Sequence, residues 1–361
     1  MKITLIAGAR PNFMKIAPII HAINALPDQT LSYRLVHTGQ HFDEKMSHTF
    51  FRQLNIPEPH VNLNCGGGTQ AEQTAAIMIA FEKELIANPA DLVLVVGDVT
   101  STMACSIVAK KLQVKVAHVE AGIRSFDMSM PEEINRLVTD ALADYFFTTT
   151  VWAGENLKKA GVTDEKIFFT GNVMIDTLIA NRDKFTKPEF WDALQLDRGK
   201  YFVLTLHRPA NVDTADGLKS LIEAITFNVN GWPILFPIHP RTAKVLRESG
   251  VVAPHLHIID PLGYLEFNYL VENAYAVITD SGGITEETTV MGIPCMTLRD
   301  NTERPETIAL GTNELLGTNP EAIKPALEKL FAGQWKKGST IEKWDGHAAQ
   351  RIVAHLIELA K

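Results

Sequence analysis

Three acidic side chains stand where a catalytic site would need them. Asp98 follows the apolar run Leu92–Val96 after a single glycine, Gly97. Glu120 follows the run Val114–Val119, and Glu132 lies in the first turn of a predicted helix. The carboxyl ends of parallel strands meet at one edge of a sheet, so we expect these acids to converge on one site suited to general acid–base catalysis. A helix cap is the alternative role for Asp98, and the helix dipole alone would favour Glu132.

Two cationic side chains follow the first predicted strand, Ile3–Ala7. The turn Gly8-Ala9-Arg10-Pro11 opens a predicted helix that also carries Lys15. Free N–H groups at a helix start, the helix dipole and two cations together predict an anion site. The alternative is an ordinary helix start with exposed Arg10 and Lys15. The turn has neither the G-x-G-x-x-G spacing nor a Walker loop, so no dinucleotide cofactor is indicated.

The second half of the chain carries a stronger anion-binding pattern. The run Ala276–Thr279 leads through Asp280 into Ser281-Gly282-Gly283 and then a predicted helix. The two glycines let the backbone approach a diphosphate, and the helix start supplies N–H donors. Glu287, one turn into this helix, is placed to accept hydrogen bonds from both hydroxyls of a ribose. The alternative is a tight turn with capping residues.

Two further segments carry histidines that we consider as functional candidates. His207 and Arg208 follow the predicted strand Tyr201–Leu206 and so lie at another strand end. His255 and His257 would share one face of a strand. No acid or cysteine stands at metal-ligand spacing from the second pair, so we expect ordinary surface histidines and no metal site there.

Short apolar strands that alternate with helices would position all these residues. Several strands are apolar at consecutive positions, as in parallel sheets covered on both faces. The alternation restarts after the polar stretch Asn181–Gly199, which predicts two α/β units, each a doubly wound sheet. The predicted helices include Gln70–Asn88, with a stripe at Thr74, Met78, Phe81 and Leu85, and His347–Ala360. The predicted strands are Ile3–Ala7, Tyr33–His37, Leu92–Val96, Val114–Val119, Tyr145–Thr149, Tyr201–Leu206, Pro233–Phe236, His257–Ile259, Ala276–Thr279 and Cys295–Leu298.

Length and composition limit the class of protein. The chain has 361 residues, which at about 150 residues per domain predicts two domains. A net charge of −8 excludes a nucleic-acid binder that relies on bulk positive charge. Three cysteines without a C-x-x-C pattern indicate a reducing compartment. The sequence shows neither a signal peptide nor a run of about 18 apolar residues, so we expect a cytoplasmic protein that does not cross a membrane.

Together, these segments resemble the non-hydrolysing UDP-N-acetylglucosamine 2-epimerases. The resemblance runs from Gly8 to about Gly317, and its nine ordered matches are together far more specific than any one of them. The resemblance implies two Rossmann-like, doubly wound α/β domains facing a cleft, the glycosyltransferase-B-like arrangement. We place the first domain at residues 1–172, a UDP-binding domain at 173–343, and a C-terminal helix at 344–361 that packs back on the first domain. The matching segments are Gly8-Ala-Arg-Pro with Lys15, His37-Thr-Gly-Gln-His41, Val96-Gly-Asp98, His118-Val-Glu-Ala-Gly122, Pro131-Glu-Glu-Ile-Asn-Arg136, Thr170-Gly-Asn172, His207-Arg208, Asp280-Ser-Gly-Gly with Glu286-Glu287, and Arg299-Asp-Asn-Thr-Glu-Arg-Pro-Glu306.

The resemblance also implies roles for individual residues. Asp98, Glu120 and Glu132 match the catalytic carboxylates of the family, and we place His207 with them. Residues that match the lining of the sugar, diphosphate and ribose sites are Arg10, Lys15, Arg136, Ser281, Gly282, Gly283 and Glu287. The implied partner is a small UDP-sugar, handled by a homodimer without metal or other cofactor and without nucleic acid or membrane.

The sequence departs from the family at a second, regulatory UDP-N-acetylglucosamine pocket. Phe42 stands where members usually carry an arginine, and Pro209 and Ala210 replace an Arg-Glu pair. The stretch around Phe42 instead resembles the branch that acts on UDP-linked 2,3-diacetamido uronic acids. The alternatives are therefore an epimerase of such a sugar or a hydrolysing epimerase. A glycosyltransferase and a non-catalytic nucleotide-sugar sensor are further alternatives.

Overall fold

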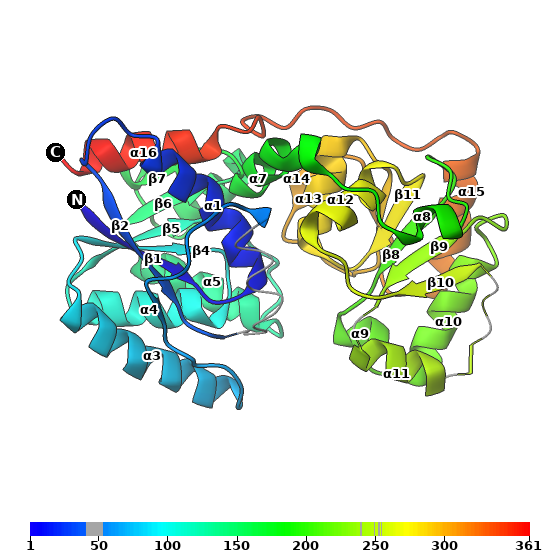
Figure 1. The fold of residues 1–361 in the computed structure, drawn as a ribbon, viewed down its shortest axis with the longest axis horizontal. Helices are drawn as coiled ribbons and strands as arrows, with labels where there is room; N and C mark the ends of the chain where they lie inside the picture. The colour runs from blue at the N-terminus through cyan, green and yellow to red at the C-terminus, as the bar shows by residue number, and fades with distance from the viewer. Residues whose placement is uncertain (41–52, 239, 249, 252, 254) are drawn as a thin grey trace. The chain divides into compact units, whose positions relative to one another are not determined.

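The computed structural model describes residues 1–40, 53–238, 240–248, 250, 251, 253 and 255–361. The chain divides into two units, the first formed by Met1–Ala180 with Glu342–Lys361 and the second by Asn181–Ile341. Each unit is a parallel sheet with helices packed against it, as the sequence predicts (Figure 1). The chain leaves the first unit at Ala180 rather than at residue 172. The helix that begins at Val173 therefore lies in the first unit, not in the second.

The sheet of the first unit is parallel throughout its described strands. Its strands are β1 (Lys2–Ala7), β2 (Ser32–His37), β3 (Val61–Asn62), β4 (Leu92–Val96), β5 (Lys115–Val119), β6 (Tyr145–Thr148) and β7 (Ile167–Phe169). They lie in the order β3-β2-β1-β4-β5-β6-β7. The order reverses between β1 and β4, and ligands of open α/β sheets bind at the carboxyl ends of strands at such a switch point.

Helices cover both faces of this sheet. They are α1 (Arg10–Asn24), α3 (Gln70–Ala87), α4 (Thr100–Lys111), α5 (Pro131–Leu142), α6 (Val151–Lys159), α7 (Val173–Asn181) and α16 (Ala348–Leu359), with a short 3₁₀ helix at Asp164–Lys166. Figure 1 shows α1 and α16 on one face and α3 and α4 on the other. Pro11 and Pro131 occupy first-turn positions, as their fixed φ favours. α16 packs along α1, far from it in sequence.

The apolar stripe of α3 differs from the predicted one. The structure buries Ile77, Phe81 and Leu85, whereas Thr74 and Met78 are only half-buried. Phe81 and Leu85 belong to both sets, so the difference is that Ile77, and not Thr74 or Met78, completes the buried stripe. Both sets fall on one face of a helix, so periodicity alone could not choose between them. These three side chains pack against strand and α4 residues in one core cluster.

The second unit repeats the same strand order. Its strands are β8 (Phe202–Thr205), β9 (Ile234–Pro237), β10 (Leu256–Ile259), β11 (Ala276–Thr279), β12 (Cys295–Thr297) and β13 (Asn313–Leu315). They form a parallel sheet in the order β10-β9-β8-β11-β12-β13 within the described residues, with its switch point between β8 and β11. The helices are α8 (Phe190–Ala193), α9 (Pro209–Val212), α10 (Ala215–Thr226), α11 (Pro240–Glu248), α12 (Tyr264–Glu272), α13 (Gly282–Met291), α14 (Pro305–Ala309) and α15 (Ile323–Phe331), with 3₁₀ helices at Arg182–Lys184 and Pro320–Ala322.

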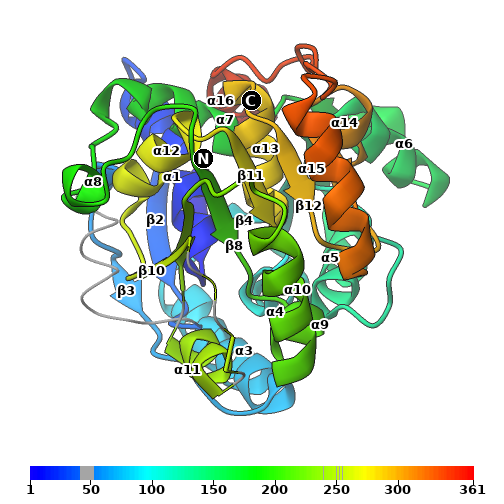
Figure 2. The same cartoon turned by 90° about the vertical axis from the view of Figure 1, so that its right-hand side faces the viewer.

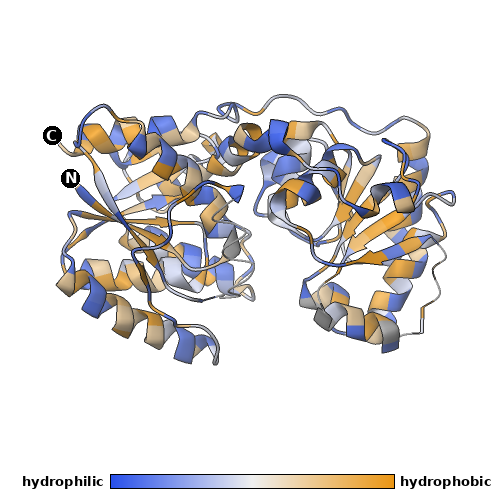
Figure 3. Ribbon diagram, in the orientation of Figure 1, coloured by the Kyte–Doolittle hydropathy of each residue, from blue (hydrophilic) through white to orange (hydrophobic). Residues whose placement is uncertain are grey.

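Strand residues of the second unit alternate between two cores. Phe202 and Leu204 pack with α10 and α15, and Val203 between them packs with α8 and α12. Burial on both faces explains why the strands are apolar at consecutive positions, as Figure 3 shows for both sheets. No helix in the described part of the chain is long and apolar enough to cross a membrane.

The ten predicted strands are confirmed within two residues at each end. The sequence analysis missed β3, β7 and β13, which have two or three residues each and lie at the sheet edges. Strands this short carry too few positions to show a pattern.

Candidate active site

Glu120 and Lys15 form a buried ion pair at the switch point of the first sheet. Lys15 Nζ lies 2.6 Å from Glu120 Oε2, and the side chains are 10% and 2% exposed. Lys15 comes from α1, and Glu120 directly follows β5. Glu120 has a φ of +70°, a backbone conformation that costs a non-glycine residue roughly 1–3 kcal/mol. Its N–H donates to the Phe147 carbonyl at 3.0 Å, which helps to hold this strained conformation.

Asp98 pairs with the buried guanidinium of Arg136. Arg136 Nη1 lies 2.6 Å from Asp98 Oδ2, and Asn135 Nδ2 donates to the Asp98 carbonyl at 2.9 Å. Both partners come from α5. The alternative role of Asp98 as a helix cap is wrong, because α4 is capped at Val99 without a side-chain hydrogen bond. Asp98 is therefore held as a partly exposed acid, 26% accessible, by two residues of one helix.

Glu132 and Glu133 are adjacent in sequence but differ in burial and in their contacts. Glu133 is buried, lies 2.8 Å from Arg136 Nη2, and accepts hydrogen bonds from the backbone and hydroxyl of Ser125. Glu132 is half-buried and makes no hydrogen bond or ion pair with any residue that the structure describes. It lies on the helix that supplies both partners of Asp98. A ligand can therefore engage Glu132 without breaking any contact that the described residues make with it.

The turn before α1 is less open to an anion than the sequence predicts. Asn12 Oδ1 accepts hydrogen bonds from the N–H groups of Gly8 and Ala9 at 2.9 and 3.0 Å, and Asn12 Nδ2 donates to the Val96 carbonyl. These two N–H groups are occupied by the chain itself, and the Lys15 ammonium faces Glu120. Arg10 begins α1, and its side chain lies outside the described part of the structure.

His207 is oriented by Asp280 at the switch point of the second sheet. His207 Nδ1 lies 2.7 Å from Asp280 Oδ1, and the imidazole is 59% exposed. Asp280 also accepts hydrogen bonds from the Arg208 N–H at 2.9 Å and from Asn211 Nδ2 at 3.0 Å. Burial would raise the pKa of Asp280, but these donors hold it below its ordinary value. An exposed imidazole oriented by a buried carboxylate is equipped to hold or move a proton.

The segment Ser281-Gly282-Gly283 begins α13, which directly follows β11 (Figure 2). A Cβ on Gly282 would lie 2.6 Å from Glu303 Oε1, so a larger residue there would displace the Glu303 carboxylate. A Cβ on Gly283 would meet no atom within 4 Å, so the backbone is open on that side. The start of a helix that is open in this way is suited to an anion.

Arg299 adds a donor that the sequence analysis did not assign. Its Nη2 is committed to Glu303 Oε2 at 2.6 Å and Asn301 Oδ1 at 3.2 Å. Its Nη1 is buried, has no hydrogen-bond partner among the described residues, and lies 3.7 Å from the Cβ position of Gly282. Its sequence signals were its place just after a predicted strand, where these sheets carry ligands, and its position in the family-matching segment Arg299–Glu306.

Glu287 is buried one turn into α13. The Tyr264 hydroxyl donates to its Oε1 at 3.1 Å. Burial raises the pKa of Glu287 to about 7, although the hydrogen bonds from Tyr264 and Asn268 act in the opposite direction. A buried acid one turn behind an anion-binding helix start is the placement predicted for ribose recognition.

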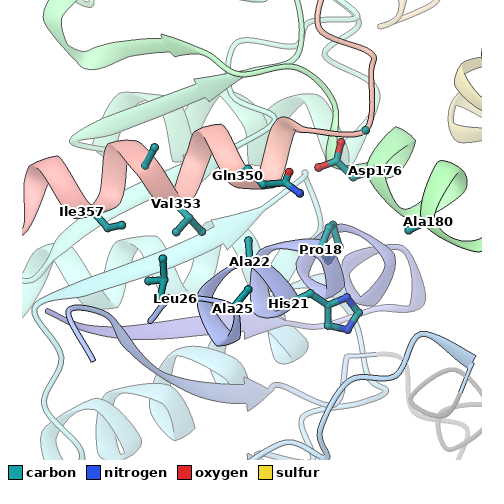
Figure 4. Close-up of a pocket in the computed structure, with 12 residues that line it drawn as sticks. Pro18, His21, Ala22, Ala25, Leu26, Asp176, Ala180, Gln350, Val353 and Ile357 are labelled. Atoms are coloured by element: carbon teal, nitrogen blue, oxygen red, sulfur yellow. The ribbon is translucent and has the colours of Figure 1, made fainter. Parts of the chain in front are cut away.

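The candidate catalytic acids Asp98, Glu120 and Glu132 do not line the apolar pocket of the first unit, although Asp176 does. This pocket has a volume of about 510 Å³ and lies between α1, α7 and α16, where Pro18, Ala22 and Val353 line it (Figure 4). Among the described residues, no group of three or more histidine, cysteine or acidic side chains is placed to hold a metal ion.

Comparisons with known proteins agree with this arrangement. A family model for UDP-N-acetylglucosamine 2-epimerase matches residues 24–357. A Methanocaldococcus jannaschii UDP-N-acetylglucosamine 2-epimerase is 44% identical over 98% of this chain and 98% of its own. A Pseudomonas aeruginosa UDP-2,3-diacetamido-2,3-dideoxy-D-glucuronate 2-epimerase is 39% identical over 99% of this chain and 100% of its own. The crystal structure of the M. jannaschii enzyme with UDP-GlcNAc and UDP matches with a TM-score of 0.89 at 42% identity, covering 99% of this chain and 100% of that one. The present chain therefore belongs to the UDP-N-acetylglucosamine 2-epimerase family.

Proposed function

We propose that this chain is a non-hydrolysing UDP-N-acetylglucosamine 2-epimerase, which inverts C2 of UDP-N-acetylglucosamine to give UDP-N-acetylmannosamine. The observation that carries the proposal is the pairing of Glu120 with Lys15 and of Asp98 with Arg136 at one sheet edge, beside the helix of Glu132. The second unit supplies an open helix start and a buried acid that suit a nucleoside diphosphate. The names of the relatives support the same activity.

The chemistry requires departure of UDP before C2 can invert. The C2 proton is not flanked by a carbonyl group, so its direct removal is slow. When the C1–O bond breaks, its electron pair leaves on the diphosphate, a carboxylate takes the C2 proton, and a C1–C2 double bond forms. In the gluco isomer the axial UDP and the axial C2 hydrogen are anti, which suits this elimination to a 2-acetamidoglucal. Protonation of C2 on the opposite face and return of the UDP oxygen to C1 complete the inversion.

The two units have different roles in this reaction. Asp98, Glu120 and Glu132 exchange the proton at C2, and Lys15 and Arg136 orient the first two acids. Arg10, whose side chain lies outside the described structure, is assigned to substrate binding by the family resemblance alone. In the second unit, the start of α13 at Ser281, Gly282 and Gly283 stabilises the departing diphosphate, His207 lines the diphosphate and exchanges a proton with it, and Glu287 holds the ribose. We further propose a homodimer in the cytoplasm, as the family resemblance implies.

Product analysis tests the reaction type. The protein is incubated with UDP-N-acetylglucosamine alone, and the products are separated by anion-exchange chromatography. We expect UDP-N-acetylmannosamine with the total UDP-sugar conserved. Stoichiometric release of UDP with free N-acetylmannosamine would identify a hydrolysing enzyme, and no conversion without an acceptor would favour a glycosyltransferase.

A second candidate substrate is a UDP-2,3-diacetamido uronic acid. A relative named for that substrate is 39% identical over 99% of this chain. The stretch of sequence that favours it includes Phe42 and lies outside the described residues. Parallel assays with both UDP-sugars at equal concentration decide the point, because the physiological substrate has the higher kcat/KM.

We expect Arg299→Met to weaken binding of UDP but not of uridine. The orphaned Nη1 lies at the start of α13, where a diphosphate would accept its hydrogen bonds. Loss of a charge-assisted bond costs about 1.5–3 kcal/mol, which is roughly tenfold or more in affinity. Calorimetry with UDP and with uridine measures both. Arg182→Met, which removes an exposed arginine paired with Glu272 in the same unit, is the matched control. Equal losses for UDP and uridine would refute the diphosphate role.

We also expect hyperbolic kinetics and conversion of the manno isomer without added UDP-N-acetylglucosamine. Phe42, Pro209 and Ala210 carry no charge, so a second diphosphate would lose bonds worth about 1.5–3 kcal/mol each. Phe42 and the side chain of Pro209 lie outside the described residues. Gln40 is a polar residue near Phe42 in sequence that could take the place of the missing charged side chains. Its Oε1 already accepts two hydrogen bonds from Ser101. A Hill coefficient clearly above one would show that a regulatory pocket exists.

A further inference from the structure

His118 is a buried histidine that the proposed chemistry does not use. It lies on β5, two residues before Glu120, and its side chain is 0% exposed. Its Nδ1 lies 2.7 Å from Asp140 Oδ1, and its Nε2 lies 2.8 Å from the Gly97 carbonyl oxygen. A carbonyl oxygen can only accept a hydrogen bond, so Nε2 carries a proton and donates it to the Gly97 carbonyl.

Asp140 is fixed from the side away from His118. Its Oδ2 lies 2.6 Å from Arg124 Nη1 and accepts a hydrogen bond from the Gly122 N–H at 3.1 Å. Burial opposes ionisation of Asp140, but the charges and hydrogen bonds of His118 and Arg124 hold its pKa below the ordinary value. Asp140 is on α5, the helix that also carries the partners of Asp98. The imidazole is therefore clamped in one orientation, with Nε2 directed at Gly97.

The backbone of Gly97 lies next to both acid–cation pairs. Its N–H donates to the Val119 carbonyl at 3.0 Å, and its φ is +66°. A Cβ on Gly97 would lie 2.9 Å from Lys15 Nζ and 3.8 Å from Glu120 Oε2. A shift of Gly97 would therefore displace Asp98, which is the next residue. It would also change the backbone contact with the Lys15–Glu120 pair.

We propose that His118 is a positioning residue for epimerisation, which holds the Gly97–Asp98 turn in the arrangement that proton transfer at C2 needs. This inference rests on the proposed function. His118 acts through the Gly97 carbonyl and touches no substrate. A misplacement of about 1 Å in such a constellation can cost roughly 10²-fold in rate. A purely structural histidine would instead lower stability without a selective effect on kcat.

Two substitutions separate the contacts of the two ring nitrogens. The amide nitrogen of His118→Gln reaches the place of Nε2 and keeps the donor to Gly97. The amide nitrogen of His118→Asn reaches the place of Nδ1 and keeps only the donor to Asp140. We expect kcat to fall roughly 10²-fold in His118→Asn and less than about tenfold in His118→Gln. KM and the affinity for UDP stay unchanged in both, because the diphosphate is bound by other residues.

Tyr201→Phe is the control for loss of a buried hydrogen bond. The Tyr201 hydroxyl donates to the Leu270 carbonyl at 2.6 Å in the second unit, far along the chain from Gly97. We expect this variant to lower the melting temperature without lowering kcat. Equal losses of kcat in the Asn and Gln variants, in proportion to their losses of stability, would overturn the proposal.

Histidine NMR of the wild-type protein tests the same proposal without relying on the folding of a variant. With ¹⁵N-labelled histidine, we expect the Nε2 of His118 to carry a proton that is hydrogen-bonded to the Gly97 carbonyl, and a ring whose Nε2 carries no proton would overturn the proposal. The wild-type assay separates this inference from the proposed function. If the wild type converts its substrate and His118→Asn is equally fast, only the role of His118 fails. If the wild type converts nothing, the proposed function fails.

Discussion

Asp98→Asn, Glu120→Gln and Glu132→Gln should each lower turnover by roughly 10²-fold or more, the usual scale for loss of a general acid or base. Each amide keeps the size of the acid it replaces but cannot take up or deliver the C2 proton. Initial rates with UDP-N-acetylglucosamine measure the effect. Calorimetry should show that UDP still binds, because the second unit retains its groups.

The matched control for these variants is Glu165→Gln. Glu165 is an exposed acid in the first unit, and it accepts a hydrogen bond from the Thr163 hydroxyl at 2.5 Å. Its substitution should leave turnover unchanged. Near-wild-type turnover in all three carboxylate variants would refute the assignment of the proton chemistry to these acids.

Glu287→Gln should make the ligand-free protein more stable than the wild type at pH 8. Burial raises the pKa of Glu287 from 4.5 to about 7. Between these values the folded state keeps a proton that the unfolded state releases, so stability falls as the pH rises. The contribution is fully present below pH 4.5 and is lost as the pH passes through about 7, a difference on the order of 3 kcal/mol. Glutamine stays neutral and avoids this loss.

Urea denaturation of both proteins between pH 4.5 and 8 measures this prediction. The curves should coincide near pH 4.5 and separate as the pH rises, whereas Glu321→Gln, an exposed acid in the same unit, should follow the wild type. The same Glu287 variant, and Glu287→Ala, should bind UDP more weakly by about 1–3 kcal/mol, because ribose hydroxyls lose an acceptor. If the free energies of unfolding of the wild type and Glu287→Gln changed in parallel with pH, burial would not raise the pKa of Glu287. Unchanged affinity for UDP would show that Glu287 does not bind the ribose.

The strands of this fold were predictable because burial on both faces makes them apolar throughout. The orientation of α5 was not. Ile134 and Leu137 are the apolar residues of this helix that periodicity would turn inward, yet they are 44% and 37% exposed. The buried face instead carries Glu133, Arg136 and Asp140. Each of these is satisfied by an ion pair, which allows a polar helix face to be buried.

The positions of the acids were predictable, but their partners were not. A strand-end rule located Asp98 and Glu120 without reference to any contact. Lys15 is 105 residues from Glu120 in sequence, and Arg136 is 38 residues from Asp98. Such pairs follow from strand order and helix placement. The same reason explains why the roles of His118 and Arg299 emerge only from the structure.

Solvent exchange at C2 tests directly whether the C2 proton is removed on one face and a new one is delivered on the other. The wild-type protein is incubated with UDP-N-acetylglucosamine in deuterated water, and the C2 proton of each UDP-sugar is followed by NMR. We expect UDP-N-acetylmannosamine that carries deuterium at C2, because a proton leaves on one face and solvent-derived deuterium is delivered on the other. Inversion that retains the original C2 hydrogen would contradict it, as would the absence of both inversion and exchange.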